Sequence, residues 1–210
     1  MFCGGVTGKE AEIRASSIKG LMRFWWRAYN YSVLGYDLQK LREREAAIFG
    51  STESGLEGKS SFSIRVEDTL NPAKNISKKV FSESSSIKYL LFGIASFRNQ
   101  VELDKEYITE NTEFTIVLSI FDNQYKKDVL QSFALLWHFG GIGAKNRNGF
   151  GRFSITDVNS KIFLTNYVFS KITENIKTIS TAISKVEFIS FSKKNDNQKV
   201  KLFKLRNNLN

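Results

Sequence analysis

The feature that most constrains the fold is a change of hydrophobic period along the chain. From residue 16 to about 34, apolar residues recur at the three- and four-residue spacing of an amphipathic helix. Residues 38–49 carry a second, shorter helical pattern, which Gly50 closes. The stretch "SFSIRVE" at 61–67 then alternates polar and apolar side chains, as a half-buried strand does. The sequence therefore predicts two helices followed by the first strand of a sheet.

The next segments continue this order. The stretches "IKYLLFGIASF" at 87–97 and "EFTIVLSIF" at 113–121 are rich in β-branched and aromatic residues, which favours two further strands. Residues 69–86 contain the only proline and a run of serines, so we expect a long loop there. A helix is predicted at about 126–139, and "GFGRFSITDV" at 149–158 is predicted to be a strand.

This order is typical of an α+β fold. With a short strand ahead of the first helix it becomes β-α-β-β-α-β, the ferredoxin-like, RRM-like arrangement. Few residues precede that helix, so we expect the opening strand to be clipped. Residues 1–158 are predicted to form this domain with extra helices. Residues 159–210 are predicted as a C-terminal extension, in which 161–184 fit neither period clearly and "VEFISFS" at 186–192 has a strand pattern.

The charge balance indicates a polyanionic partner. Lysine and arginine number 31 against 21 aspartates and glutamates, a net charge of +10. Such a surplus is typical of proteins that bind nucleic acid or an acidic membrane surface. A basic surface that only maintains solubility is the alternative.

Several site classes are excluded by what the sequence lacks. A lone Cys3 forms no internal disulfide, and together with the lone His138 it cannot build the usual four-ligand zinc site. The first residues have no signal-peptide layout, and no apolar run reaches about eighteen residues. We therefore expect a soluble, cytoplasmic protein with no cofactor, no metal and no membrane attachment.

The stretch "GGIGAKNRNGFGRF" at 140–153, here called the glycine loop, is the first candidate site. A nucleotide-binding loop follows a strand and opens a helix, so that phosphate meets the helix N-terminus. This loop instead leaves a predicted helix and enters a predicted strand. It also has no Gly-Lys-Ser/Thr motif and does not match the dinucleotide spacing, so nucleotide binding of that kind is excluded by context.

Contact with an RNA backbone fits the composition of this loop better. Lys145, Arg147 and Arg152 supply positive charge, and glycines allow a close backbone approach. Asn146 and Asn148 tolerate left-handed turns and can donate to phosphate or base edges. Phe150 and Phe153 could stack on bases, or else belong to the core.

The first predicted helix carries a second candidate surface. Its apolar face is expected to hold Ile18, Leu21, Met22, Trp25 and Tyr29, with Ser16 or Ser17 as the N-cap. A different face carries Lys19, Arg23 and Arg27, with Trp26 and Asn30 beside them. Trp25 is expected in the core and Trp26 at its border. If the first helix and the glycine loop meet at one edge of the sheet, Arg23, Arg27 and the loop form one continuous basic groove.

These motifs together resemble a known family. The stretches "EIRASSIKGLMRFWWRA", "EREAAIFGS" and "GGIGAKNRNGFGRF" are similar to the first subunit of the type III-B CRISPR effector, the Cmr complex, within the RAMP superfamily. The Arg-Phe-Trp-Trp-Arg run at 23–27 is the most specific part, and the glycine loop is shared by the wider superfamily. The resemblance covers roughly residues 1–158.

This resemblance implies a non-catalytic, RNA-binding subunit of an RNA-guided antiviral complex, near the 3′ part of the guide. Its partners would be CRISPR RNA, target single-stranded RNA and the other subunits. The second RAMP-like domain usual in the family is expected to be absent, or reduced to a remnant after about residue 185. The predicted RNA contacts are Lys19, Arg23, Trp26, Arg27, Gly141, Gly143, Lys145, Asn146, Arg147, Asn148, Gly149 and Arg152.

Two other functions stay open. A RAMP-type, metal-independent CRISPR RNA-processing endoribonuclease would need a general base, for which His138 is the only histidine. Metal-dependent cleavage would need clustered carboxylates, whereas Glu67 and Asp68 are adjacent and would point to opposite faces of a strand. The basic surface could also dock an acidic protein subunit, because that interaction would use the same charges.

Overall fold

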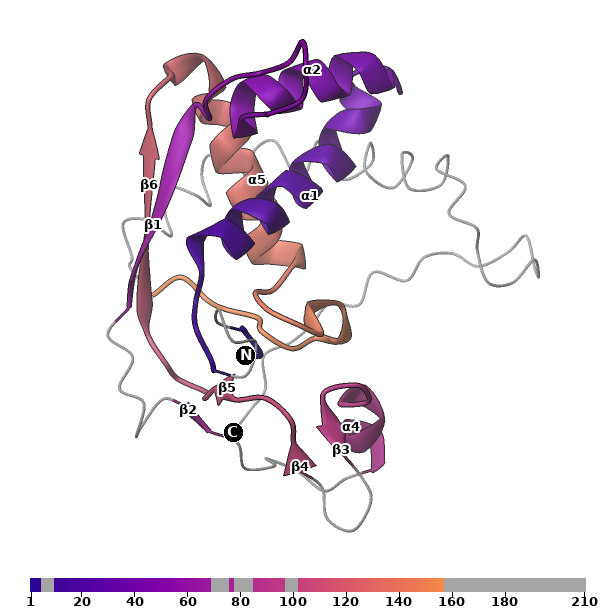
Figure 1. Cartoon of the computed structure of the whole chain (residues 1–210), viewed down its shortest axis with the longest axis vertical. Helices are drawn as coiled ribbons and strands as arrows, with labels where there is room; N and C mark the ends of the chain where they lie inside the picture. The colour runs from indigo at the N-terminus through magenta and orange to yellow at the C-terminus, as the bar shows by residue number, and fades with distance from the viewer. Residues whose placement is uncertain (5–9, 69–75, 78–84, 97–101, 157–210) are drawn as a thin grey trace, which may run out of the picture.

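Two long helices cross one another beside an antiparallel pair of strands (Figure 1). The computed structural model describes residues 1–4, 10–68, 76–77, 85–96 and 102–156. The C-terminal extension predicted at 159–210, including its strand pattern, lies outside these residues.

The first helix, α1 (Ala15–Val33), confirms the helix predicted at 16–34. Its N-cap is Arg14, and no side chain caps it, so the predicted serine cap is wrong. The buried face holds Ile18, Met22, Trp26, Tyr29 and Asn30. The core tryptophan is thus Trp26 rather than Trp25, because the Trp26 Nε1 group donates to Asp128 Oδ1 at 3.0 Å in a buried pair. That bond satisfies the one polar atom of the indole.

The second helix, α2 (Leu38–Phe49), confirms the predicted bounds and the predicted stop. Asp37 caps it by accepting from the backbone N–H groups of Gln39 and Lys40. Gly50 ends it with φ +80°, and a Cβ at this position would lie 2.9 Å from the backbone nitrogen of Ser60. Glycine is required there on both counts.

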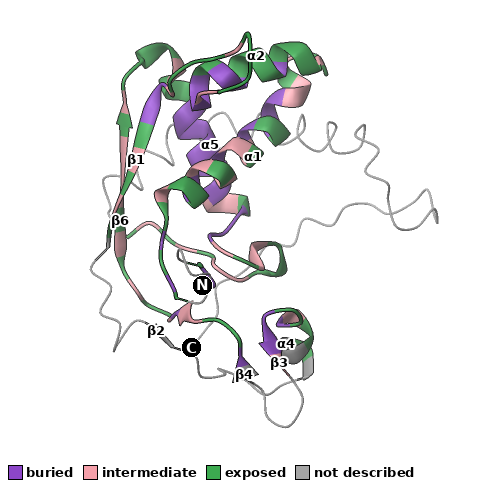
Figure 2. Cartoon of the chain, viewed as in Figure 1, coloured by how far each residue is buried: buried purple, intermediate pink, exposed green. Residues whose placement is uncertain are grey.

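The main sheet consists of β1 (Phe62–Asp68) and β6 (Phe114–Ile120), which are two of the predicted strands. They pair antiparallel, with Phe62 opposite Ile120 and Asp68 opposite Phe114. The last long helix, α5 (Lys126–Phe139), follows the short 3-10 helix η1 (Asn123–Tyr125) and confirms the helix predicted at 126–139. Figure 2 shows buried residues gathered where α1, α2 and α5 face one another. This core contains Ile18, Met22, Trp26, Ile48, Phe49, Phe62, Val129, Phe133 and Leu136.

The remaining elements are short. β2 (Ile76–Ser77) pairs with β5 (Tyr107–Ile108), and β3 (Ala95–Ser96) pairs with β4 (Glu102–Leu103). The strand predicted at 87–97 is wrong over its first part, where the chain forms α4 (Ser85–Leu90). A short apolar run fits either period, so its sequence could not distinguish helix from strand. β2 lies within the predicted long loop 69–86, most of which falls outside the described residues.

The first and last strands of the predicted ferredoxin-like sheet are not formed in the described residues. Near the N-terminus, Phe2 and Ala144 form only an isolated bridge, as do Gly4 and Ala11. Residues 149–156 form no strand, although the backbone N–H of Ile142 donates to Gly151 O at 2.8 Å. The fold is α+β, as predicted, with β1 and β6 as its longest strand pair, and the ferredoxin-like topology is not confirmed.

Candidate nucleic-acid interface

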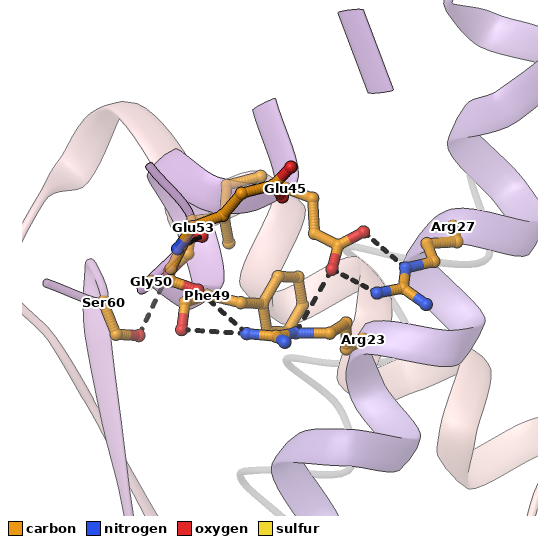
Figure 3. Close-up of polar contacts among 9 residues, drawn as sticks. Arg23, Arg27, Glu45, Phe49, Gly50, Glu53 and Ser60 are labelled. Atoms are coloured by element: carbon orange, nitrogen blue, oxygen red, sulfur yellow. Dashed lines mark hydrogen bonds and ion pairs between the residues drawn. The ribbon is translucent and has the colours of Figure 1, made fainter. Parts of the chain in front are cut away.

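The arginines of α1 are held by one carboxylate on α2 (Figure 3). Arg27 donates to Glu45 through both Nε and Nη2, and the Nε atom of Arg23 lies 3.4 Å from Glu45 Oε1. Arg23 also donates from Nη2 to the carbonyls of Phe49 and Gly50, at 3.3 and 3.0 Å. These carbonyls belong to the end of α2, so Arg23 and Arg27 join α1 to that helix.

This pairing leaves the three cations of α1 unequally available. The side chain of Arg27 is 51% exposed and that of Arg23 is 35% exposed, although both share a carboxylate that is only 12% exposed. Hydrogen bonding to Glu45 raises the pKa of Arg27. Lys19 is half-buried, with Nζ 5.2 Å from the centre of the Phe62 ring. Burial lowers the pKa of Lys19, and the charge of Arg23 lowers it further. Arg27 is therefore the cation of this group best placed to meet a ligand.

The glycines of the loop are required mainly by the packing of the protein on itself. A Cβ on Gly143 would lie 2.4 Å from Phe2 O, and one on Gly151 would lie 2.0 Å from Ile142 O. A Cβ on Gly141 would lie 2.8 Å from Phe150 O. The space beside Gly141 and Gly143 that was predicted for an RNA backbone is therefore filled by the chain itself, which corrects their predicted role.

The tip of the loop is a tight turn, η2 (Asn146–Asn148). Lys145 enters it in the left-handed region at φ +61°, and Gly149 leaves it at φ +89° with nothing within 4 Å of a Cβ. The left-handed positions of this turn are thus Lys145 and Gly149, and not the asparagines, which the sequence showed could tolerate them. Asn146 donates from Nδ2 to Gly141 O at 3.1 Å and so closes the turn. Arg147, Asn148 and Gly149 remain exposed at the tip.

Arg147 joins the loop to α1. Its guanidinium carbon lies 5.4 Å from the centre of the Phe24 ring, within the range of a cation–π contact. Figure 1 shows α2 and the glycine loop on opposite sides of α1. Arg23 and Arg27 turn toward α2, whereas the loop meets α1 at Phe24. The predicted groove is corrected accordingly, because the two basic regions flank the exposed side of α1 instead of facing each other.

The last cation of the loop lies beside the only histidine. Arg152 is exposed and donates from Nη2 to His138 O at 3.1 Å. Burial lowers the pKa of His138, and the charge of Arg152 lowers it further, so the imidazole is neutral at pH 7. Phe150 packs edge-on against Phe2 at 5.7 Å between ring centres, and Phe153 packs near Phe133 at 6.3 Å. These two phenylalanines therefore face the interior, which is the core alternative that the sequence left open.

Trp26 has no accessible surface and cannot contact RNA, so its assignment to the site is wrong. Two features were missed instead. Phe24 is exposed next to the buried face of α1, and it lies between the helix cations and the glycine loop. Nothing in the sequence indicated this position. The sequence could have identified Glu45 as a buried carboxylate, because it lies at helical spacing from Leu41 and Ile48, which are both buried. A charged residue on an apolar stripe indicates a buried ion pair.

Among the described residues, no group of three or more His, Cys, Asp or Glu side chains could hold a metal ion. None of the helices in that part of the chain is long and apolar enough to span a bilayer.

Comparison with known proteins agrees with the motifs. The sequence model of the RAMP superfamily matches residues 1–154, which include α1 and the glycine loop. Cmr subunit Cmr1-1 of the CRISPR system of Pyrococcus furiosus is 31% identical over 157 residues, which is 75% of this chain and 44% of its own length. Cmr1-2 of the same organism is 28% identical over 170 residues, which is 74% of this chain and 89% of its own length.

A solved structure supports the same relationship. The crystal structure of Cmr1 from Pyrococcus furiosus in its apo form matches with a TM-score of 0.53 at 28% identity. The match covers 69% of this chain and 42% of that one, so this chain spans less than half the length of Cmr1-1 and of the solved Cmr1. The resemblance to the first subunits of the Cmr complex is confirmed. The chain belongs to the RAMP superfamily.

Proposed function

We propose that this chain is a non-catalytic, RNA-binding subunit of a type III-B CRISPR effector complex, which works in the cytoplasm with the other subunits. CRISPR RNA and target single-stranded RNA would lie against the glycine loop and the exposed side of α1. Lys145, Arg147 and Arg152 would contact phosphate. The similarity to the Cmr1 proteins supports the assembly, and the distribution of charge supports the RNA contact.

The observation that carries this proposal is a contrast between two groups of cations. On α1, α2 and β1, five arginines each pair with a carboxylate: Arg23, Arg27, Arg42, Arg44 and Arg65. In the loop, by contrast, no carboxylate among the described residues pairs with Lys145, Arg147 or Arg152. Like charges held close together without counter-charges repel one another and attract a polyanion. A phosphate chain is such a polyanion.

The fixed shape of the loop supports a binding role rather than a flexible solvated one. The turn is closed by Asn146, and its base is anchored where Ala144 N donates to Phe2 O at 2.6 Å. Arg147 is held over Phe24. Because the charges are held before a ligand arrives, less conformational entropy is lost on binding.

The test is the salt dependence of binding to a single-stranded RNA oligonucleotide by the full chain. With three phosphate contacts, the logarithm of the binding constant should fall against the logarithm of salt concentration with a slope of about −2, from about 0.7 per contact. Arg147→Gln should reduce that slope by about 0.7. The matched control is Arg65→Gln, which removes the same charge from the exposed face of β1 and should leave the slope unchanged. A slope near zero in the unmodified chain would refute RNA binding through these cations and favour a protein-docking role for the same surface.

A further inference from the structure

A row of three aromatic rings lies between the helix cations and the glycine loop. Phe24 and Trp25 meet edge-on with their ring centres 5.5 Å apart, and Trp25 lies 6.0 Å from Phe139, the last residue of α5. Phe24 is 45% exposed and Phe139 is 49% exposed. Trp25 is half-buried between them. We call these three residues the aromatic row.

The aromatic row is fixed relative to the basic loop. A Cβ on Gly140, where the loop begins, would lie 2.6 Å from Trp25 Nε1, so the backbone leaves α5 in close contact with the indole. Arg147 reaches back over Phe24 at one end of the row. At the other end, Arg152 donates to the carbonyl of His138, the residue before Phe139. One cation therefore lies over the Phe24 ring, and a second is bound to the backbone next to Phe139.

Within the part of the chain that the structure describes, no packing contact accounts for the exposure of Phe24 and Phe139. The neighbouring large aromatics of the core, Trp26, Phe49 and Phe62, are fully or almost fully buried. Two exposed phenylalanines that both contact the half-buried Trp25 form an apolar patch on the surface, and such patches mark binding surfaces. The flanking arginines restrict the ligand further, because charge complementarity requires an anionic molecule. A ligand with both negative charge and flat faces is a single-stranded nucleic acid.

We propose that the aromatic row is a stacking platform for unpaired nucleobases, with Arg147 and Arg152 holding the adjoining phosphates. This inference rests on the proposed function and adds to it which part of the RNA is recognised. A duplex would not use the platform, because its bases are already stacked inside the helix. Since every base has a π-face, stacking here would be tolerant of sequence.

The experiment compares two oligonucleotides of equal length and charge with the full chain. One is a single-stranded RNA with all its bases, and the other is an abasic strand with the same phosphates. The unmodified chain should bind the base-bearing strand more tightly, by at least about fivefold for each stacked base. Phe139→Leu should remove most of that preference while keeping the salt slope, because leucine retains apolar volume but not the aromatic face. Phe24→Leu should do the same but also release Arg147, so Phe139→Leu is the decisive variant.

The control variant is Phe121→Leu, which changes a phenylalanine that is 70% exposed beyond the end of β6. It should leave the preference unchanged. Equal binding of both strands by the unmodified chain, with a normal salt slope, would overturn the platform while leaving phosphate binding intact. A preference that persists in Phe139→Leu and Phe24→Leu would also overturn it, and the row would then be assigned to contact with a neighbouring protein. Absence of salt-dependent binding to either strand would instead refute the proposed function itself.

Discussion

Replacement of Asp128 tests how α1, α2 and α5 are held together behind the candidate site. Asp128 is buried in the first turn of α5 and serves two partners. Its Oδ1 accepts from the Nε1 group of Trp26 at 3.0 Å, and its Oδ2 lies 3.1 Å from Nη2 of Arg44. Because Trp26 has no accessible surface, its N–H cannot turn to water if the carboxylate is removed.

The magnitude follows from these two contacts. In Asp128→Ala, the unsatisfied buried indole N–H should cost about 1–3 kcal/mol. Loss of the pair with Arg44, which is 44% exposed, should add at most about 1 kcal/mol. The free energy of unfolding should therefore fall by about 1–4 kcal/mol. Asp128→Asn keeps an acceptor for Trp26 and loses the ion pair with the partly exposed Arg44, so the free energy of unfolding should fall by about 1 kcal/mol or less.

Urea unfolding of the full chain, followed by tryptophan fluorescence, measures both variants against the unmodified protein. The expected result is a clearly lower midpoint for Asp128→Ala than for Asp128→Asn, with similar slopes. Equal losses in the two variants would refute the reasoning, since the bond to Trp26 would then contribute nothing.

Four further outcomes are expected. Gly143→Ala should lower the urea midpoint more than Gly149→Ala does, because both glycines have positive φ but only the Cβ at position 143 would clash with backbone atoms. Equal decreases in the urea midpoint would contradict this. Burial raises the pKa of the Cys3 thiol from 9.0 to about 11, so its alkylation at pH 8 should be far slower in the native than in the unfolded chain, and equal alkylation rates would count against burial. The free energy of unfolding should decrease above pH 9, because the thiol ionises first in the unfolded chain. Labelled RNA incubated with or without divalent metal should stay intact, whereas cleavage abolished by His138→Ala would support the endoribonuclease alternative. Glu45→Gln should lower the urea midpoint by weakening the junction of α1 with α2, and an unchanged midpoint would show that the ion pairs add no stability.

The parts of the fold predicted from the sequence are those with a strong local period. The helices α1, α2 and α5 and the strands β1 and β6 each carry a sustained pattern or a clear stop such as Gly50. The strand expected at 87–97 begins instead as a helix, and the sequence could not show this because a short apolar run fits either period. Local periodicity could not decide whether Trp25 or Trp26 is the buried tryptophan, because the burial of Trp26 depends on a hydrogen-bond partner, Asp128, that lies far along the chain.

The candidate site was predictable in composition but not in arrangement. The cations at Arg27 and Arg147 are exposed, as the sequence indicated. The sequence could not show that Glu45 draws Arg23 and Arg27 toward α2, since this ion-paired cluster forms only when two helices pack. Nor could the sequence show whether the space beside a glycine is open to a ligand or is filled by another part of the chain. Gly143, in contact with Phe2 at the N-terminus, is of the second kind.

The central claim is that RNA lies against the glycine loop and the exposed side of α1. A cross-linking map tests it most directly: the full chain is bound to single-stranded RNA carrying photoreactive bases, irradiated and digested, and the attached peptides are identified. The account predicts cross-links in the peptides that contain Phe24, Phe139 and the 145–152 segment, lost at high salt. Cross-links confined to the exposed face of β1 and β6, with none in α1 or the loop, would contradict it.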